Sequence, residues 1–195
     1  MDNERVRIRQ VEVLSHDWYL LQKTTFDYQR ADGVWQTLNR ETYDRGNGAT
    51  ILLYNLVRRS VILVRQFRLP TYRDGHDGFL LETPAGLLDN ASPELRIRAE
   101  VEEETGFRVG AVRKIFEVFM SPGSVTEKLH FFVAPYEPHE RIGAGGGVQA
   151  EGEDIEVMEV PIQQALLMMA EGDIADGKTI MLLQYAQLHL FGAGS

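Results

Sequence analysis

The stretch AGLLDNASPELRIRAEVEEETGF, residues 85–107, contains a helix with well-marked ends. Ser92 is a good N-cap, and Pro93 suits the first helical position because the N–H that proline lacks has no helical partner there. Gly106 stands where a glycine commonly ends a helix in the left-handed conformation. The sequence therefore predicts a helix from about Pro93 to Thr105.

Apolar runs on both sides of this helix predict a sheet. Thr50 to Tyr54 and Ser60 to Phe67 are nearly continuous apolar runs, which are typical of buried strands, and Phe79 to Glu82 is a shorter one. Further along, the pattern predicts strands near Ala111–Met120 and Lys128–Tyr136 and helices at Ile162–Glu171 and Lys178–Leu190. Strands and helices mixed in this order favour an α+β fold, a mixed β-sheet flanked by helices.

The N-terminal region has a different pattern. Val6 to Asp44 alternates with a period of two and is rich in aromatic residues, and Ala31-Asp32-Gly33 is a turn signal between two such runs. A β-hairpin is the natural interpretation. The sequence therefore predicts an N-terminal β-rich subdomain, residues 1–45, ahead of a main domain, residues 46–195.

Composition excludes several classes of protein. The 195 residues carry a net charge of -9, which argues against a nucleic-acid-binding surface, because phosphate binding needs clustered Lys and Arg. There is no cysteine, so disulfides, thiolate zinc sites and cysteine nucleophiles are excluded. No run approaches the roughly 20 apolar residues of a membrane span, and the first residues lack the apolar core of a signal peptide. We expect a soluble, cytoplasmic protein that binds neither nucleic acid nor membrane.

Three glutamates share one face of the predicted helix. At about 100° per residue, Glu100, Glu103 and Glu104 fall within an arc of roughly 100°, whereas Glu102 projects from the opposite side, where Arg98 can pair with it. Mutual repulsion and the helix dipole both oppose three carboxylates near a helix C-terminus. A hard divalent cation such as Mg²⁺ prefers such oxygen ligands. From spacing alone, a metal site and a charged surface are about equally favoured.

The same stretch resembles the Nudix box, the signature of the Nudix hydrolases. Gly86 followed by Ala-Glu-Val-Glu-Glu-Glu-Thr-Gly-Phe, residues 99–107, matches its second half. Counted from Gly86, Ser92 takes the place of the first glutamate of the box, and the spacing to the helix is one residue short. Ala99 replaces the arginine that orients a metal-binding glutamate in the family. Arg96, on the same helix face as Glu100, is the candidate substitute.

The resemblance covers almost the whole chain and is to the GDP-mannose pyrophosphatase branch of the family, close kin of ADP-sugar pyrophosphatases. The segments that carry it are Arg40–Ala49, Arg65–Arg68, Met120–Gly123, Gly145–Val148, Glu153–Val157 and Asp176–Thr179. It implies the Nudix fold, an α/β/α sandwich. It also implies a homodimer in which the N-terminal β-rich region is exchanged between subunits and completes the substrate pocket of the partner.

A metal site is implied by this resemblance. The implied ligands of Mg²⁺, with Mn²⁺ as a substitute, are the main-chain oxygen of Ala85 and the carboxylates of Glu100, Glu104 and Glu153, with Glu103 in or beside the metal shell. Glu153 or Glu127 is the candidate general base, because each lies in a turn-rich loop able to reach the site. An exposed acidic loop is the alternative interpretation of Glu153 and its neighbours. The run Gly143 to Gly147 lacks the Gly-Lys-Ser/Thr ending of a phosphate loop and is interpreted as a flexible connector.

Substrate-binding residues are implied in the same way. They are Trp18, Arg40 and Glu41 from the partner subunit, and Arg68, Gly86, Leu87, Glu127 and Lys178 from the same subunit. Arginine suits phosphate because its planar fork binds two oxygens, and an aromatic ring such as that of Trp18 can stack on a base. A lone aromatic residue in a strand, however, is more often part of a core or interface.

The resemblance implies a Mg²⁺-dependent pyrophosphatase that cleaves GDP-mannose into GMP and mannose 1-phosphate. ADP-ribose, which would give AMP and ribose 5-phosphate, is the competing substrate. A hypothesis of a different class is a catalytically weak nucleotide-binding module, motivated by Ala99 and Ser92. A plain Mg²⁺- or Ca²⁺-binding protein is disfavoured, because such a site does not need the distant Arg68 and Glu127.

Overall fold

The computed structural model describes residues 3–192, apart from the side chain of Glu151, and these residues form two compact units. The first unit comprises the chain up to Asn47 together with Val118–Leu129. The second comprises Gly48–Glu117 and the chain from His130 onward. Within residues 3–192, no helix is long and apolar enough to cross a membrane.

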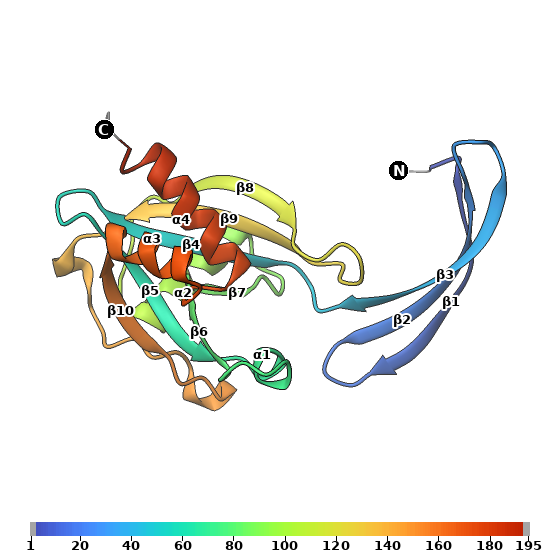
Figure 1. Ribbon diagram of the computed structural model, residues 1–195. Coiled ribbons are helices and arrows are strands. Elements are labelled where there is room, and N and C mark those ends of the chain that lie inside the picture. Colours follow the sequence, from blue (N-terminus) through green and yellow to red (C-terminus); the bar gives the residue numbers. More distant parts are fainter. Residues whose placement is uncertain (1–2, 193–195) are drawn as a thin grey trace. The chain divides into compact units, whose positions relative to one another are not determined.

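An antiparallel three-stranded sheet makes up most of the first unit (Figure 1). Its strands are β1 (Val6–His16), β2 (Leu20–Gln29) and β3 (Trp35–Asp44), in that order. The predicted turn is present: Gly33 has φ 84°, and the Asp32 carboxylate accepts a hydrogen bond from the Val34 N–H at 3.1 Å. The prediction of a single hairpin missed a strand, because the turn between β1 and β2 contains neither glycine nor proline.

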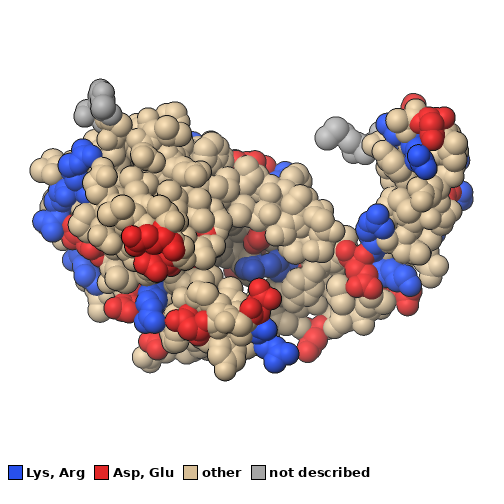
Figure 2. All heavy atoms as spheres, viewed as in Figure 1, with Lys and Arg blue, Asp and Glu red and all other residues tan. Residues whose placement is uncertain are grey.

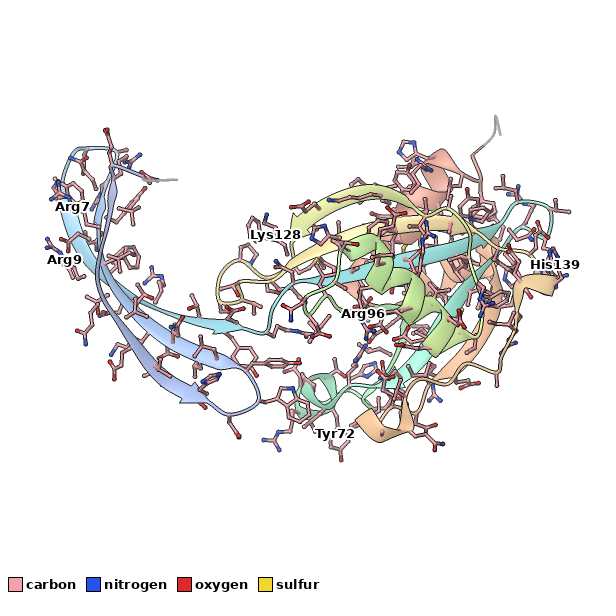
Figure 3. All side chains as sticks on the ribbon, turned by 180° about the vertical axis from the view of Figure 1, so that it is seen from behind. Arg7, Arg9, Tyr72, Arg96, Lys128 and His139 are labelled. Atoms are coloured by element: carbon pink, nitrogen blue, oxygen red, sulfur yellow. The ribbon has the colours of Figure 1, made fainter. Side chains whose placement is uncertain are left out.

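No residue of β1, β2 or β3 is fully buried, and both acidic and basic side chains lie on the surface of this sheet (Figure 2). Side-chain pairs between strands accompany the backbone pairing. The Arg7 guanidinium lies 4.0 Å from the centre of the Trp35 ring, and Arg9 donates to Asp27 at 2.6 Å; Figure 3 labels both arginines. Several large apolar side chains of β1 are exposed: Ile8, Val11, Val13 and Leu14. The loop before β9 joins the end of β3, where the Tyr43 N–H donates to the Ser124 carbonyl at 2.8 Å.

The sheet of the second unit has seven strands. They are β4 (Gly48–Asn55), β5 (Ser60–Phe67), β6 (Phe79–Glu82), β7 (Ala85–Leu87), β8 (Arg113–Phe119), β9 (Lys128–Pro135) and β10 (Glu156–Pro161). The main order is β10-β5-β4-β9-β8, with β6 paired to β5 and β7 to β4. The predicted strands at residues 60–67 and 79–82 are confirmed. The acidic stretch of residues 151–161 is only partly a loop, because its second half is β10, an edge strand antiparallel to β5.

Helices cover both faces of this sheet, which confirms the predicted sandwich. They are α1 (Leu69–Arg73), α2 (Pro93–Thr105), α3 (Ile162–Glu171) and α4 (Gly177–His189), with short 3₁₀ turns η1 (Pro138–Glu140) and η2 (Gln149–Glu151). Helices α3 and α4 lie in front of the sheet in Figure 1, and α2 lies in front of it in the reverse view of Figure 3. Ile97 and Val101 of α2 pack with Ile51 and Leu53 of β4 in the core.

Both ends of α2 are as predicted. The Ser92 hydroxyl accepts a hydrogen bond from the Leu95 N–H at 3.4 Å, and Gly106 has φ 74°. These local signals fix the length of the helix, and therefore the position of its glutamates above the sheet.

Candidate active site

The glutamates of α2 differ sharply in exposure. Glu100 is 5% exposed and Glu104 is 2% exposed, whereas the Glu103 side chain retains 37% of its exposure. Glu102, on the other side of the helix, pairs with Arg108 at 3.0 Å. The predicted common face of Glu100, Glu103 and Glu104 is confirmed, and two of its carboxylates are buried.

The predicted partner of Arg98 is wrong. Arg98 pairs with Glu94 at 2.8 Å instead of with Glu102. A glutamate four residues before a basic residue is the more favourable orientation on a helix, and Arg108, beyond the helix end, takes Glu102.

Arg96, labelled in Figure 3, contacts two of the three carboxylates. Its guanidinium lies 2.6 Å from Glu100 and 3.5 Å from Glu103, and its Nε donates to the carbonyl oxygen of Leu87 at 3.2 Å. This confirms the contact expected of Arg96 as the substitute for the arginine missing at Ala99. The same side chain ties α2 to the backbone of β7.

The backbone of β7 lies directly against the buried carboxylates. The Ala85 N–H donates to Glu104 Oε2 at 3.3 Å. A Cβ atom added at Gly86 would overlap the carboxylate of Glu100, so any other residue would displace that group. The structure therefore brings Ala85, Gly86, Glu100 and Glu104 together.

Glu104 lies in an unfavourable environment for a negative charge. Burial raises the pKa of Glu104 well above its usual range, and the charges of Glu100 and Glu153 raise it further. The charge of Arg68 and the hydrogen bond from the Ala85 N–H act in the opposite direction. Glu153 is thus within electrostatic range of Glu104. Its role as a metal ligand, implied by the resemblance, stays a prediction.

The glycine-rich run caps the C-terminus of α2 and is not the flexible connector predicted. The amides of Gly146, Gly147 and Gly143 donate to the carbonyls of Glu104, Glu103 and Gly106 at 2.9, 3.1 and 3.2 Å. A Cβ atom added at Gly145, where φ is 73°, would collide with the backbone of Glu104 and Thr105. Glycine is required here because the loop backbone packs directly on the helix end.

The same loop holds Glu153. The Val148 N–H donates to Glu153 Oε2 at 2.8 Å, and a Cβ atom added at Gly147 would collide with that carboxylate. With Glu153 bonded in this way and Glu100 bonded to Arg96, no three His, Asp or Glu side chains of residues 3–192 stand in a coordinating arrangement. The donor set nevertheless fits a hard divalent cation, because its atoms are all oxygens and the buried Glu104 lies close to other negative charges.

Two predicted substrate-binding cations are joined by a residue that the sequence analysis did not single out. Arg68 donates to both oxygens of Glu82 at 2.8 Å, and Lys178 donates to Glu82 at 2.6 Å. Burial alone would raise the pKa of Glu82, but the hydrogen bonds and charges of Arg68 and Lys178 lower it to about 2. The sequence signal that could have identified Glu82 is its position at the end of the apolar run Phe-Leu-Leu-Glu.

The remaining predicted site residues belong to the first unit. Trp18 lies in the turn before β2, not in a strand, and is 81% exposed. Arg40 donates to the Asn39 carbonyl at 2.7 Å, and Glu41 faces Lys23 across the β2–β3 pair. Glu127 lies 3.6 Å from Arg45 and has a side chain only 15% exposed.

Comparison with known proteins agrees with the fold. The chain belongs to the Nudix hydrolases: the family model described as the NUDIX domain matches residues 44–183. The model described as the GDP-mannose pyrophosphatase NudK N-terminal domain matches residues 5–43. The resemblance seen in the sequence is thereby confirmed, and this family uses divalent metal ions.

The similar proteins include several GDP-mannose pyrophosphatases. One from Klebsiella pneumoniae is 56% identical, over 90% of this chain and 88% of its own. One from Shigella flexneri is 53% identical, over 95% and 96%, and one from Salmonella arizonae is 52% identical, over 97% and 100%. A crystal structure of an ADP compounds hydrolase has a TM-score of 0.73 and covers 100% of this chain and 98% of its own; at 19% identity it shows the shared fold.

Proposed function

We propose that this protein hydrolyses the pyrophosphate bond of GDP-mannose, giving GMP and mannose 1-phosphate, with Mg²⁺ as its metal ion. The observation that carries this is the buried pair Glu100 and Glu104 against the backbone of Ala85 and Gly86. Relatives named GDP-mannose pyrophosphatase, 52–56% identical over most of the chain, supply the choice of substrate.

The carboxylates of Glu100, Glu104 and Glu153 and the main-chain oxygen of Ala85 would hold the metal, with Glu103 beside them. A bound Mg²⁺ would neutralise pyrophosphate charge and lower the pKa of a water molecule. Arg96 keeps Glu100 and Glu103 in place, so it takes over the role of the arginine absent at Ala99.

Substrate phosphates would meet Arg68 and Lys178. Both are fixed by Glu82, and the charge of Arg68 acts on Glu104, so these cations lie within electrostatic reach of the metal ligands. Gly86 and Leu87, on the β7 backbone beside Glu100 and Arg96, would line the same site.

Glu153 is the proposed general base. It belongs to the same unit as the α2 carboxylates and acts electrostatically on Glu104, whereas Glu127 belongs to the first unit and lies beside Arg45. We expect Glu153→Gln to lower kcat strongly. Glu127→Gln should mainly raise KM; the reverse outcome would make Glu127 the base.

We further propose that the chain forms a homodimer in which the N-terminal β-rich subdomain, residues 1–45, is exchanged. The exposed apolar side chains of β1 and the lack of a core in the three-stranded sheet support this, because such a sheet is marginally stable alone. Trp18, Arg40 and Glu41 would then complete the site of the partner. A cytoplasmic location stays a prediction.

Mixed dimers test the exchange. Arg40→Ala and Glu104→Gln should each be nearly inactive alone, but their co-expressed mixed dimer should regain activity because one of its two sites is intact. No recovery in a purified mixed dimer would contradict exchange.

Hydrolysis itself is tested by incubating the protein with GDP-mannose or ADP-ribose, with Mg²⁺ or with EDTA, and measuring nucleoside monophosphate release. We expect Mg²⁺-dependent GMP release that is lost in Glu104→Gln. Release should be kept in the control Glu159→Gln, because Glu159 lies on β10 and pairs with Arg58. Binding of both nucleotides without release from either would favour the nucleotide-binding module instead. Faster release of AMP would make ADP-ribose the substrate.

A further inference from the structure

Glu82 joins two cations that are far apart in the sequence. It ends β6 and is 2% exposed, and its oxygens accept from Arg68, which precedes α1, and from Lys178, in the first turn of α4. The side chains of Arg68 and Lys178 retain 37% and 13% exposure. The carboxylate is therefore buried beneath cations that solvent still reaches.

Both cations are restrained without any ligand. Arg68 meets Glu82 through Nε and Nη2, so the Nη1 group of its planar guanidinium faces away from that carboxylate. Lys178 also lies 3.0 Å from Asp176, the N-cap of α4. The start of α4 is in turn attached to the end of β6, because the Thr83 N–H donates to Thr179 Oγ1 at 2.8 Å.

A second ion pair in the same unit has the same geometry but is exposed to solvent. Arg58 meets Glu159 in the same side-on manner, at 2.6 and 3.3 Å, but both side chains are exposed, by 52% and 35%. Burying a carboxylate as deeply as Glu82 carries a large desolvation cost, which stability alone does not require. The difference between the two pairs indicates a role for the placement of Arg68 and Lys178.

We infer that Glu82 is a positioning residue for the substrate, which presents Arg68 and Lys178 as a preformed pair of cations to the phosphates. The inference rests on the proposed function, since that supplies the phosphate-bearing ligand. Long cationic side chains lose rotamer freedom when they bind phosphate, and ordering them beforehand removes that loss from binding. Glu82 thus acts on affinity through its partners and touches no reacting atom.

Steady-state kinetics with GDP-mannose and saturating Mg²⁺ separate this role from a structural one. We expect Glu82→Gln to raise KM at least tenfold, to change kcat less than threefold and to leave the Mg²⁺ concentration at half-maximal rate unchanged. Glu82→Asp keeps the charge on a shorter side chain and should raise KM by a smaller factor; it supplies the test if Glu82→Gln does not fold, as judged by circular dichroism. The matched control, Glu159→Gln, should have the kinetics of the unchanged protein.

A double-variant comparison shows whether Glu82 acts through its partners. In a protein already carrying Arg68→Ala and Lys178→Ala, adding Glu82→Gln should change KM less than twofold. An unchanged KM in folded Glu82→Gln and Glu82→Asp, or a further tenfold rise in the Arg68→Ala, Lys178→Ala background, would overturn the inference.

Failure of the proposed function is recognised separately, as absence of Mg²⁺-dependent hydrolysis by the unchanged protein. Calorimetric titration with GMP then tests Glu82 by itself. The Kd for GMP should rise at least fivefold in Glu82→Gln and stay unchanged in Glu159→Gln. An equal Kd in both variants, or no binding of GMP by the unchanged protein, would overturn the inference.

Discussion

Replacing Glu82 by glutamine should lower the free energy of unfolding at pH 7 by about 3 kcal/mol. The two cations lower the pKa of Glu82 from 4.5 to about 2 in the folded protein. At about 1.4 kcal/mol per pKa unit, this difference corresponds to about 3 kcal/mol as an upper bound. Removing one partner from a buried ion pair typically costs about 3–5 kcal/mol, which is of the same order.

The pH dependence follows from the sign of this shift. Because the folded-state pKa lies below the unfolded one, ionised Glu82 contributes its full stability above pH 4.5 and loses it as the pH falls toward 2. By linkage, the contribution of about 3 kcal/mol at pH 7 should decrease to about 2 kcal/mol at pH 3.5. The unchanged protein and Glu82→Gln should therefore become more alike in stability in acid.

Urea denaturation at several pH values between 7 and 3.5 measures this difference. Far-ultraviolet circular dichroism is the suitable signal, because both tryptophans, Trp18 and Trp35, lie in the first unit and their fluorescence would not report on the second. Glu159→Gln, which breaks an exposed pair, should cost less than about 1 kcal/mol. A loss below about 1 kcal/mol in Glu82→Gln, or one that does not vary with pH, would refute the electrostatic account.

Three further predictions concern α2 and its cap. Burial and neighbouring charges raise the pKa of Glu104, so its ionised form destabilises the fold at neutral pH. In EDTA at pH 7, Glu104→Gln should therefore have a higher Tm than the unchanged protein, and this difference should shrink in acid. Mg²⁺ should not stabilise Glu104→Gln. Gly145→Ala should cost at least about 1–2 kcal/mol in urea denaturation and lower kcat, because the left-handed backbone disfavours a Cβ that would also meet Glu104, whereas Gly110→Ala, with open space around it, should change neither. Ser92→Ala should cost about 1 kcal/mol in the same assay, through loss of the N-cap.

Much of the fold was predictable because its signals are local. Ser92 and Gly106 define α2 within its own sequence, and the apolar run at residues 60–67 defines β5. The elements that were missed lack such signals. Strand β10, at the edge of the sheet, has the sequence Glu-Val-Met-Glu-Val-Pro, which does not alternate regularly. The turn after β1 has no glycine to mark it.

The site also has a part with local sequence signals and a part that depends on contacts between distant segments. Helical spacing alone placed Glu100 and Glu104 on one face with Arg96 beside them. The role proposed for Glu82 depends on Lys178, which lies 96 residues after Glu82 in the sequence. The cap on α2 comes from Gly146, a loop residue whose composition indicated flexibility. Contacts between distant segments have no pattern in a single sequence, so neither could be read from it.

These distant contacts explain how α2 tolerates its carboxylates. The amides of the glycine loop take the carbonyls at the helix end, so the C-terminal partial charge that opposes Glu103 and Glu104 is partly satisfied. Arg96 compensates Glu100 and Glu103, whereas Arg68, the cation that acts on Glu104, is already bonded to Glu82. The buried charge that its surroundings still oppose is that of Glu104. The proposed metal ion would therefore bind beside this buried negative charge. The cations held by Glu82 remain available to bind the phosphates.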